Sequence, residues 1–164
     1  LALISFCAFF LDGFALSAEN LVGAAKGSRD LPRFDRAVRR TNMLAAATAL
    51  GLALILFSFG NHFIAMLTDL TTVRLIAANF LPLAVVYVAL SFGAFQLDGI
   101  FIGTTHVAEM RNASLASVIL FILASAWLTP LYGNTALWLT FIGYVVVRAI
   151  TLALYYPRIR RGIG

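Results

Sequence analysis

Residues 41–67, TNMLAAATALGLALILFSFGNHFIAML, form a long apolar run that decides the class of fold. A helix needs about 20 mostly apolar residues to cross the hydrocarbon core of a membrane, and this run exceeds that length. Leu, Ala and Ile dominate it and the other apolar runs of the chain, which favours long helices over the alternating strands of an outer-membrane barrel. The run therefore predicts a transmembrane helix.

The composition of the whole chain indicates the same class. Hydrophobic residues make up 62% of the 164 residues and charged residues only 12%, so a soluble domain could not cover its surface with polar side chains. The same excess excludes a disordered chain. Cys7 is the one cysteine, which excludes a disulfide scaffold.

Five segments are long and apolar enough, or nearly so, to cross a membrane, and they predict an all-α integral membrane protein with five transmembrane helices. The expected spans are residues 1–25, 41–67, 73–105, 112–129 and 135–156. Pro82 lies inside the third span and should bend it, because proline lacks the backbone donor and clashes with the preceding turn. Gly93 is a second, weaker hinge candidate.

The basic residues predict the orientation. Ten of the twelve fall on one side if the helices alternate across the membrane, against Arg74 alone on the other, so this side is expected to be cytoplasmic, with the C-terminus on it. The ten are Lys26, Arg29, Arg33, Arg36, Arg39, Arg40, Arg111, Arg158, Arg160 and Arg161. Residues 26–40 are expected to form an amphipathic cytoplasmic link, with a short helix lying on anionic lipid. A nucleic-acid partner is not expected, because no base-stacking motif accompanies these charges.

Four ionisable residues lie within the expected spans: Asp12, Glu19, Asp98 and Arg148. A charge in hydrocarbon costs at least about 2.5–3.5 kcal/mol, so such residues are functional candidates by default. Asp12 and Glu19 are seven residues apart and share one helix face, although Glu19 is near enough to the interface to reach the headgroups. Asp98 could exchange a proton or accept Na⁺, or could be a neutral carboxyl bonded to a neighbouring helix.

Arg148 is expected to have a carboxylate partner. It precedes Pro157 by nine residues, about 13 Å along a helix, and snorkelling recovers only part of that depth. The pair could be static, or Arg148 could compete with a cation or a proton for the carboxylate. Ser91 and Thr105, seven residues before and after Asp98, extend its polar face. The sequence has no zinc-ligand spacing, nucleophile triad, phosphate loop or nucleotide fingerprint, so neither an enzyme nor a cofactor is expected, apart from H⁺ or Na⁺ as a coupling ion.

Two tripeptides are identical, Leu11-Asp12-Gly13 and Leu97-Asp98-Gly99, and both place a carboxylate beside a glycine, where a neighbouring backbone can approach. Three longer stretches carry a resemblance: FLDGFALSAENLVGAAKGSRD (10–30), FDRAVRRT (34–41) and FQLDGIFIGTTHVAEMRNA (95–113). In order and spacing they resemble the DinF-like branch of the multidrug and toxic compound extrusion (MATE) transporters.

The resemblance implies that the chain is helices eight to twelve of a twelve-helix transporter, most of its C-terminal lobe. Since Leu1 is not a methionine and no charge precedes the first span, we expect a piece of a longer protein of the inner (plasma) membrane. The N-terminal lobe and the preceding helix would then be partners within the same protein. The family couples substrate export to inward Na⁺ or H⁺ flow, and Asp98 matches a carboxylate of its proposed cation site, with Asp12 part of the DinF-like pattern.

Three functions are open on this basis. The first is an antiporter that exports a small organic compound, held when cationic by a carboxylate and by the aromatic faces of Phe92 or Phe95. Asp98, Asp12 and Glu19 are then the candidate cation-binding residues, and Ser91 and Thr105 are expected to line the cavity with these two phenylalanines. The second is a flippase of the same superfamily that moves a lipid-linked substrate. The third is a membrane scaffold subunit without transport, in which the carboxylates pair statically.

Overall fold

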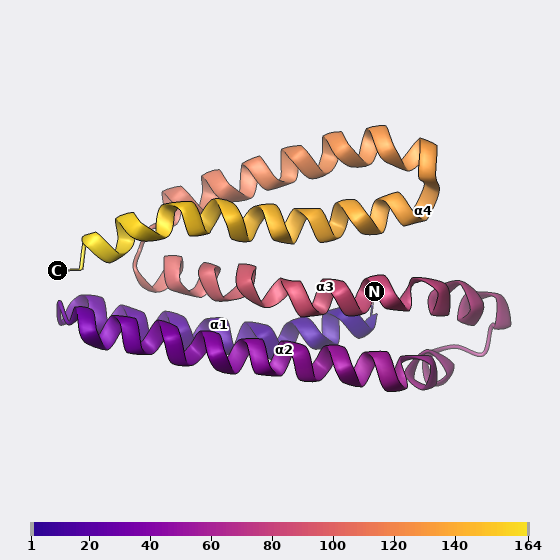
Figure 1. Cartoon of the computed structure of the whole chain (residues 1–164), viewed down its shortest axis with the longest axis horizontal. Helices are drawn as coiled ribbons and strands as arrows, with labels where there is room; N and C mark the ends of the chain where they lie inside the picture. The colour runs from indigo at the N-terminus through magenta and orange to yellow at the C-terminus, as the bar shows by residue number, and fades with distance from the viewer. Residues whose placement is uncertain (1, 164) are drawn as a thin grey trace.

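The computed structural model describes residues 2–163 as a bundle of long helices that lie roughly parallel to one another (Figure 1). The helices are α1 (Ala2–Gly27), α2 (Leu31–Leu67), α3 (Thr71–Gly103) and α4 (Val107–Arg161). All four are long and apolar enough to cross a membrane. The all-α membrane class predicted from the sequence is therefore confirmed.

The prediction of five separate helices differs from the structure, because the fourth and fifth spans belong to one element. α4 holds a single break at Gly133, where the backbone takes φ 60° and ψ −143° and the chain turns back on itself (Figure 1). Glycine adopts this conformation without the clash that a Cβ would bring. We call residues 107–132 the first arm and residues 134–161 the second arm of the α4 hairpin. Each arm spans about 40 Å, enough to cross the hydrocarbon core once.

The helix ends also differ from the expected spans. α2 begins at Leu31, because the Asp30 carboxylate accepts a hydrogen bond of 2.8 Å from the backbone N–H of Arg33 and Pro32 fits the first turn. The helix then continues without interruption into the span. The expectation of a separate interfacial helix within 26–40 is therefore wrong.

α3 and α4 are separated by a short link that the expected bounds misplaced. α3 ends at Gly103, and Thr105 follows in the left-handed region with φ 61°, so Thr105 leaves the helical face that it was expected to share with Asp98. α4 begins five residues earlier than residue 112 and ends beyond residue 156, with Pro157 inside its last turns. α3 itself runs through Pro82 as one helix, and a hinge at Pro82 or Gly93 stays a prediction.

A seam of small residues brings α1 and α3 into close contact. Gly99 and Gly103 are one helical turn apart on α3, and a Cβ on either would collide with backbone oxygen of α1, that of Ala15 or of Glu19. A Cβ on Gly23 would in turn lie 3.1 Å from the carbonyl oxygen of Gly103. Small residues spaced in this way let transmembrane backbones approach and pack by van der Waals contact. The first LDG tripeptide does not repeat the arrangement, because nothing lies within 4 Å of a Cβ on Gly13.

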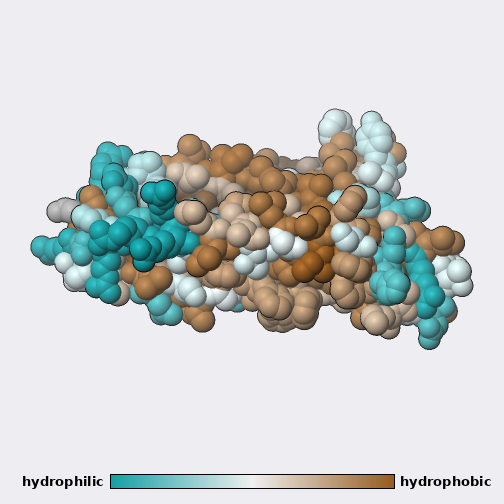
Figure 2. All heavy atoms as spheres, turned by 60° about the horizontal axis from the view of Figure 1, so that its bottom comes forward, coloured by the Kyte–Doolittle hydropathy of each residue, from teal (hydrophilic) through white to brown (hydrophobic). Residues whose placement is uncertain are grey.

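The two ends of the bundle differ in charge. The α1–α2 link, the α3–α4 link and the C-terminus lie at one end of the bundle (Figure 1). We call it the basic end, because the ten basic residues that predicted the orientation lie in or beside these segments. The α2–α3 link and the Gly133 turn lie at the other end. Figure 2 shows hydrophobic residues over the middle of one face and hydrophilic residues gathered toward both ends. Large side chains such as Phe9, Phe57 and Leu154 are 70% or more exposed, as expected of a surface that faces lipid.

The matched tripeptides give a test of the α1–α3 seam. Gly99→Ala should lower the melting temperature of the purified full-length protein, because the new methyl group meets helix backbone that cannot rotate away; overpacking typically costs about 1–3 kcal/mol. Gly13→Ala is the control and should leave the melting temperature unchanged or raise it, since alanine favours the helix by about 1 kcal/mol. Equal melting temperatures for Gly99→Ala and the wild type would contradict the seam.

Candidate functional site

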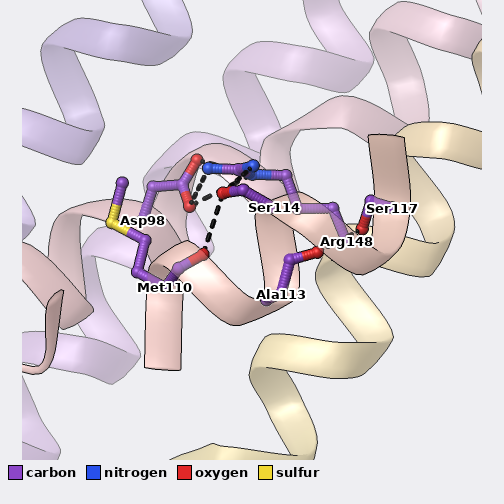
Figure 3. A network of polar contacts seen from close by, with 6 residues as sticks. All are labelled: Asp98, Met110, Ala113, Ser114, Ser117 and Arg148. Carbon is purple, nitrogen blue, oxygen red and sulfur yellow. Dashed lines mark hydrogen bonds and ion pairs between the residues drawn. The ribbon is translucent and has the colours of Figure 1, made fainter. Parts of the chain in front are cut away.

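Asp98 of α3 and Arg148 of the second arm form an ion pair (Figure 3). The Arg148 Nη2 group donates to Asp98 Oδ1 over 2.9 Å, and Nε donates to Oδ2 over 3.1 Å and to Oδ1 over 3.3 Å. The side chains are only 13% (Arg148) and 23% (Asp98) exposed. Two parallel hydrogen bonds of this kind fix the guanidinium in the plane of the carboxylate.

Ser114 of the first arm forms a hydrogen bond with the third nitrogen of the same guanidinium. Its Oγ accepts a hydrogen bond of 2.6 Å from Arg148 Nη1 and donates one of 2.8 Å to the backbone carbonyl of Met110, one turn earlier. Figure 3 shows the guanidinium reaching from the second arm to both the Asp98 carboxylate and the Ser114 hydroxyl. Arg148 therefore joins α3 to both arms of the α4 hairpin.

The two carboxylates expected on α1 are not part of this pair. Asp12 is exposed, yet it is near enough to Asp98 for a Coulombic interaction between the two side chains. Glu19 is half-buried, and its backbone packs against Gly103 of the seam. The structure thus brings Asp98 together with Arg148 and places Asp12 nearby, whereas no ion pair of Glu19 is found within residues 2–163.

The residues expected to line a cavity lie in different surroundings. Ser91 is 2% exposed, and its hydroxyl donates to the carbonyl of Val88 within α3. Phe92 and Phe95 are half-buried on the same helix. Thr105 lies in the link at the basic end, where its hydroxyl accepts a hydrogen bond of 2.9 Å from Lys26 Nζ. A pocket of about 560 Å³ does exist, but mostly apolar residues near the opposite end line it and none of these four does. Their part in a cavity stays a prediction.

A ladder of aromatic rings, which was not predicted from the sequence, begins next to the pair. Tyr87 of α3 stacks on Phe141 of the second arm with ring centroids 4.4 Å apart, and Phe121 of the first arm packs edge-on against Phe141 and Tyr144. Tyr144 lies one turn before Arg148 on the second arm, near enough to its guanidinium for an electrostatic interaction, but no hydrogen bond joins the two within residues 2–163. The ladder continues away from the basic end to Trp138 and Phe80. The sequence did not reveal the ladder, because the spacing of these aromatic residues along each helix is the same as that of aromatic residues that face lipid.

A second, exposed ion pair ties the hairpin to α2 at the basic end. Arg160 Nη2 donates to Asp35 Oδ2 over 2.7 Å, and Nε donates to Oδ1 over 2.9 Å. Tyr156 stacks on the fully buried Phe34 beside this pair, with ring centroids 6.2 Å apart. We call these four residues the basic-end tether. Away from this tether, the hairpin packs mainly against α3 and not against α2.

Comparison with known proteins shows that the chain is similar to a family and to one characterised relative. The sequence model of the MatE family matches residues 1–128, which include Asp12, Asp98 and Ser114. The chain is 34% identical to DNA damage-inducible protein F of Escherichia coli (strain K12) over 158 residues, which are 96% of this chain and 34% of that relative. It therefore spans about a third of the length of that protein. No solved structure matches the chain significantly.

The pair should behave as a unit when its charges are removed. Asp98→Asn or Arg148→Gln alone leaves one buried charge without its partner, at a cost of up to about 3 kcal/mol, and should lower the melting temperature. The double variant removes both charges, so its loss of melting temperature should be smaller than the sum of the two single losses. A double-mutant cycle in detergent measures this difference. Asp69 and Arg74 form an exposed pair and are the control, for which the same cycle should show no coupling. Additive losses at Asp98 and Arg148 would contradict the pairing.

Proposed function

Because this chain belongs to the MatE family, and its resemblance to the DinF-like branch is confirmed, we propose that it forms part of a secondary active antiporter. The transporter exports drugs or other toxic organic compounds and is driven by inward flow of H⁺ or Na⁺. The N-terminal lobe and the preceding helix of the longer protein complete it. The reaction needs no enzyme chemistry, since only binding and a change of conformation are involved.

The Asp98–Arg148 pair is the observation that supports this proposal most. Both charges lie within long apolar helices, where an unpaired charge is costly, so the carboxylate keeps the arginine as its partner until something else neutralises it. A proton or Na⁺ is such a competitor. When it binds, the carboxylate no longer holds the guanidinium, and the strongest polar contact between α3 and the α4 hairpin is lost.

Loss of that contact gives the driving ion a means to change the conformation. An ion shifts an equilibrium between two conformations only to the extent that it binds one of them better. With Asp98 paired, the conformation in which α3 packs on the hairpin is favoured, and the ion site is occupied by Arg148. With Asp98 neutralised, conformations that separate the two elements become accessible. In this way ion binding and the direction in which the cavity faces are coupled.

Asp12 and the aromatic side chains suit the remaining roles. Asp12 is exposed near Asp98 and can receive the ion on its path or bind it jointly. A cationic organic substrate could be held by these carboxylates and by ring faces, those of Phe92 and Phe95 or of the aromatic ladder. In this proposal the protein lies in the inner membrane with the basic end and its C-terminus in the cytoplasm, an orientation that the distribution of basic residues predicts.

Neutralising Asp98 tests the proposal. In the full-length protein, Asp98→Asn should abolish efflux driven by a pH or Na⁺ gradient in proteoliposomes, since no charge is left for the ion to neutralise, while the amount of protein in the membrane stays similar. Asp69→Asn removes an exposed carboxylate at the opposite end and should leave efflux unchanged. Driving efflux separately with each gradient also identifies the coupling ion.

Two results would contradict the proposal. Normal gradient-driven efflux by Asp98→Asn would remove Asp98 from the ion site. Absence of efflux by the wild type under either gradient, with a panel of organic cations, would favour a scaffold in which the pair is static.

A further inference from the structure

The Ser114 hydroxyl has no role in the proposal above, although it makes the shortest contact to the guanidinium. We infer that Ser114 is a positioning residue that keeps Arg148 on the α4 hairpin after Asp98 has been neutralised, and so sets how readily the coupling ion binds. This inference rests on the proposed function. It concerns a residue that binds neither the ion nor the substrate but acts through Arg148.

The two partners of Arg148 belong to different elements of the bundle. Asp98 belongs to α3, whereas Ser114 belongs to the first arm of the same hairpin that carries Arg148 on its second arm. If α3 and the hairpin separate, the guanidinium can keep only the partner on its own hairpin. Ser114 is the hydrogen-bond partner that it then keeps among the described residues, and the plane of separation lies between α3 and the hairpin rather than between the two arms.

The hydroxyl is oriented for this task by its own donor. The Ser114 O–H donates to the carbonyl of Met110, so the lone pairs of Oγ remain available to the N–H of Arg148 (Figure 3). A hydroxyl can serve as donor and acceptor at the same time. The back-bond to Met110 also fixes the side-chain rotamer, which keeps the acceptor at the second arm whether or not Asp98 is charged.

The consequence for ion binding follows from the difference between the two states. With Asp98 charged, the guanidinium has three hydrogen bonds to the carboxylate in addition to the one to Ser114, so loss of the serine hydroxyl is partly compensated. With Asp98 neutralised, Ser114 is the one hydrogen-bond acceptor of the guanidinium that remains among the described residues, with the Tyr144 side chain nearby. Loss of the serine hydroxyl leaves a cation in an apolar setting without that acceptor. An unsatisfied buried charge is the more costly case. Removing the hydroxyl should therefore disfavour the neutralised state and weaken ion binding.

The experiment compares Ser114→Ala, Ser114→Thr and Ser117→Ala in the full-length transporter. Ser117 is one turn further along the same arm, and its hydroxyl donates to the Ala113 carbonyl over 2.7 Å, but no hydrogen bond joins it to Arg148 within residues 2–163. It therefore controls for the loss of a back-bonded serine hydroxyl as such. Ser114→Thr keeps the hydroxyl and should restore the wild-type behaviour.

Gradient-driven efflux is measured as a function of pH, or of Na⁺ concentration if Na⁺ is the driving ion. Ser114→Ala should move the midpoint of the pH profile down by roughly 0.5–1 unit, or raise the half-saturating Na⁺ concentration about three- to tenfold. Ser114→Thr and Ser117→Ala should keep the wild-type midpoint. An unchanged midpoint for Ser114→Ala, a shift to higher pH or tighter Na⁺ binding, or an equal shift for Ser117→Ala would overturn the inference.

A melting experiment decides the question if Ser114→Ala proves inactive. Ser114→Ala should lower the melting temperature of the purified protein more in an Asp98→Ala background than in the wild type, because Arg148 then has no carboxylate to fall back on. Equal or smaller losses in that background would overturn the inference. Failure of the proposed function gives a different result, since Asp98→Asn would then retain gradient-driven efflux whatever Ser114 does.

Discussion

A guanidinium at the depth of Arg148 needs a partner wherever the chain places it, and much of the architecture near the site can be understood from that need. The hydrocarbon core offers no water to solvate the charge, so the partner must come from another helix or another arm. Asp98 supplies it from α3 and Ser114 from the first arm of α4. Arg148 joins its own arm to α3 and to the first arm, and Tyr144 of the aromatic ladder lies one turn before it.

The small residues of the α1–α3 seam serve the same arrangement from the other side. Gly99 follows Asp98 immediately, so the glycine that lets α1 approach and the carboxylate that pairs with Arg148 lie on adjacent positions of one helix. α1 is thereby held close to α3, which brings Asp12 within electrostatic reach of Asp98. A larger residue at Gly99 would push α1 away and separate the two carboxylates. The identical tripeptide at Leu11-Asp12-Gly13 has no such packing, so identity of sequence there does not mean identity of structure.

The sequence was sufficient for features that depend on one segment at a time. Apolar length predicted the membrane helices, and the depth of Arg148 predicted that it would have a carboxylate partner. It could not choose among Asp12, Glu19 and Asp98, because that choice depends on how helices rotate against each other. Ser114 and the aromatic rings were missed for the same reason, since a serine or a phenylalanine within an apolar run does not reveal which neighbour it faces. The helix ends were misplaced at the α3–α4 link, because the left-handed conformation of Thr105 that ends the helical path involves a single residue with no glycine to mark it.

The basic-end tether has a geometric consequence for any motion of the hairpin. Arg160 and Asp35 join α4 to α2 at one end, and Phe34 and Tyr156 pack beside them, whereas the Gly133 turn at the other end has no comparable link to α2 among the described residues. If its contacts with α3 were released, a hairpin held only by the tether would swing about that end instead of sliding. The second arm extends about 40 Å from Arg160 to Gly133, so a rotation of about 10° at the tether would carry the turn about 7 Å while the tether barely moves. Movement would then be largest at the end of the bundle that carries few basic residues, and smallest at the end where they gather.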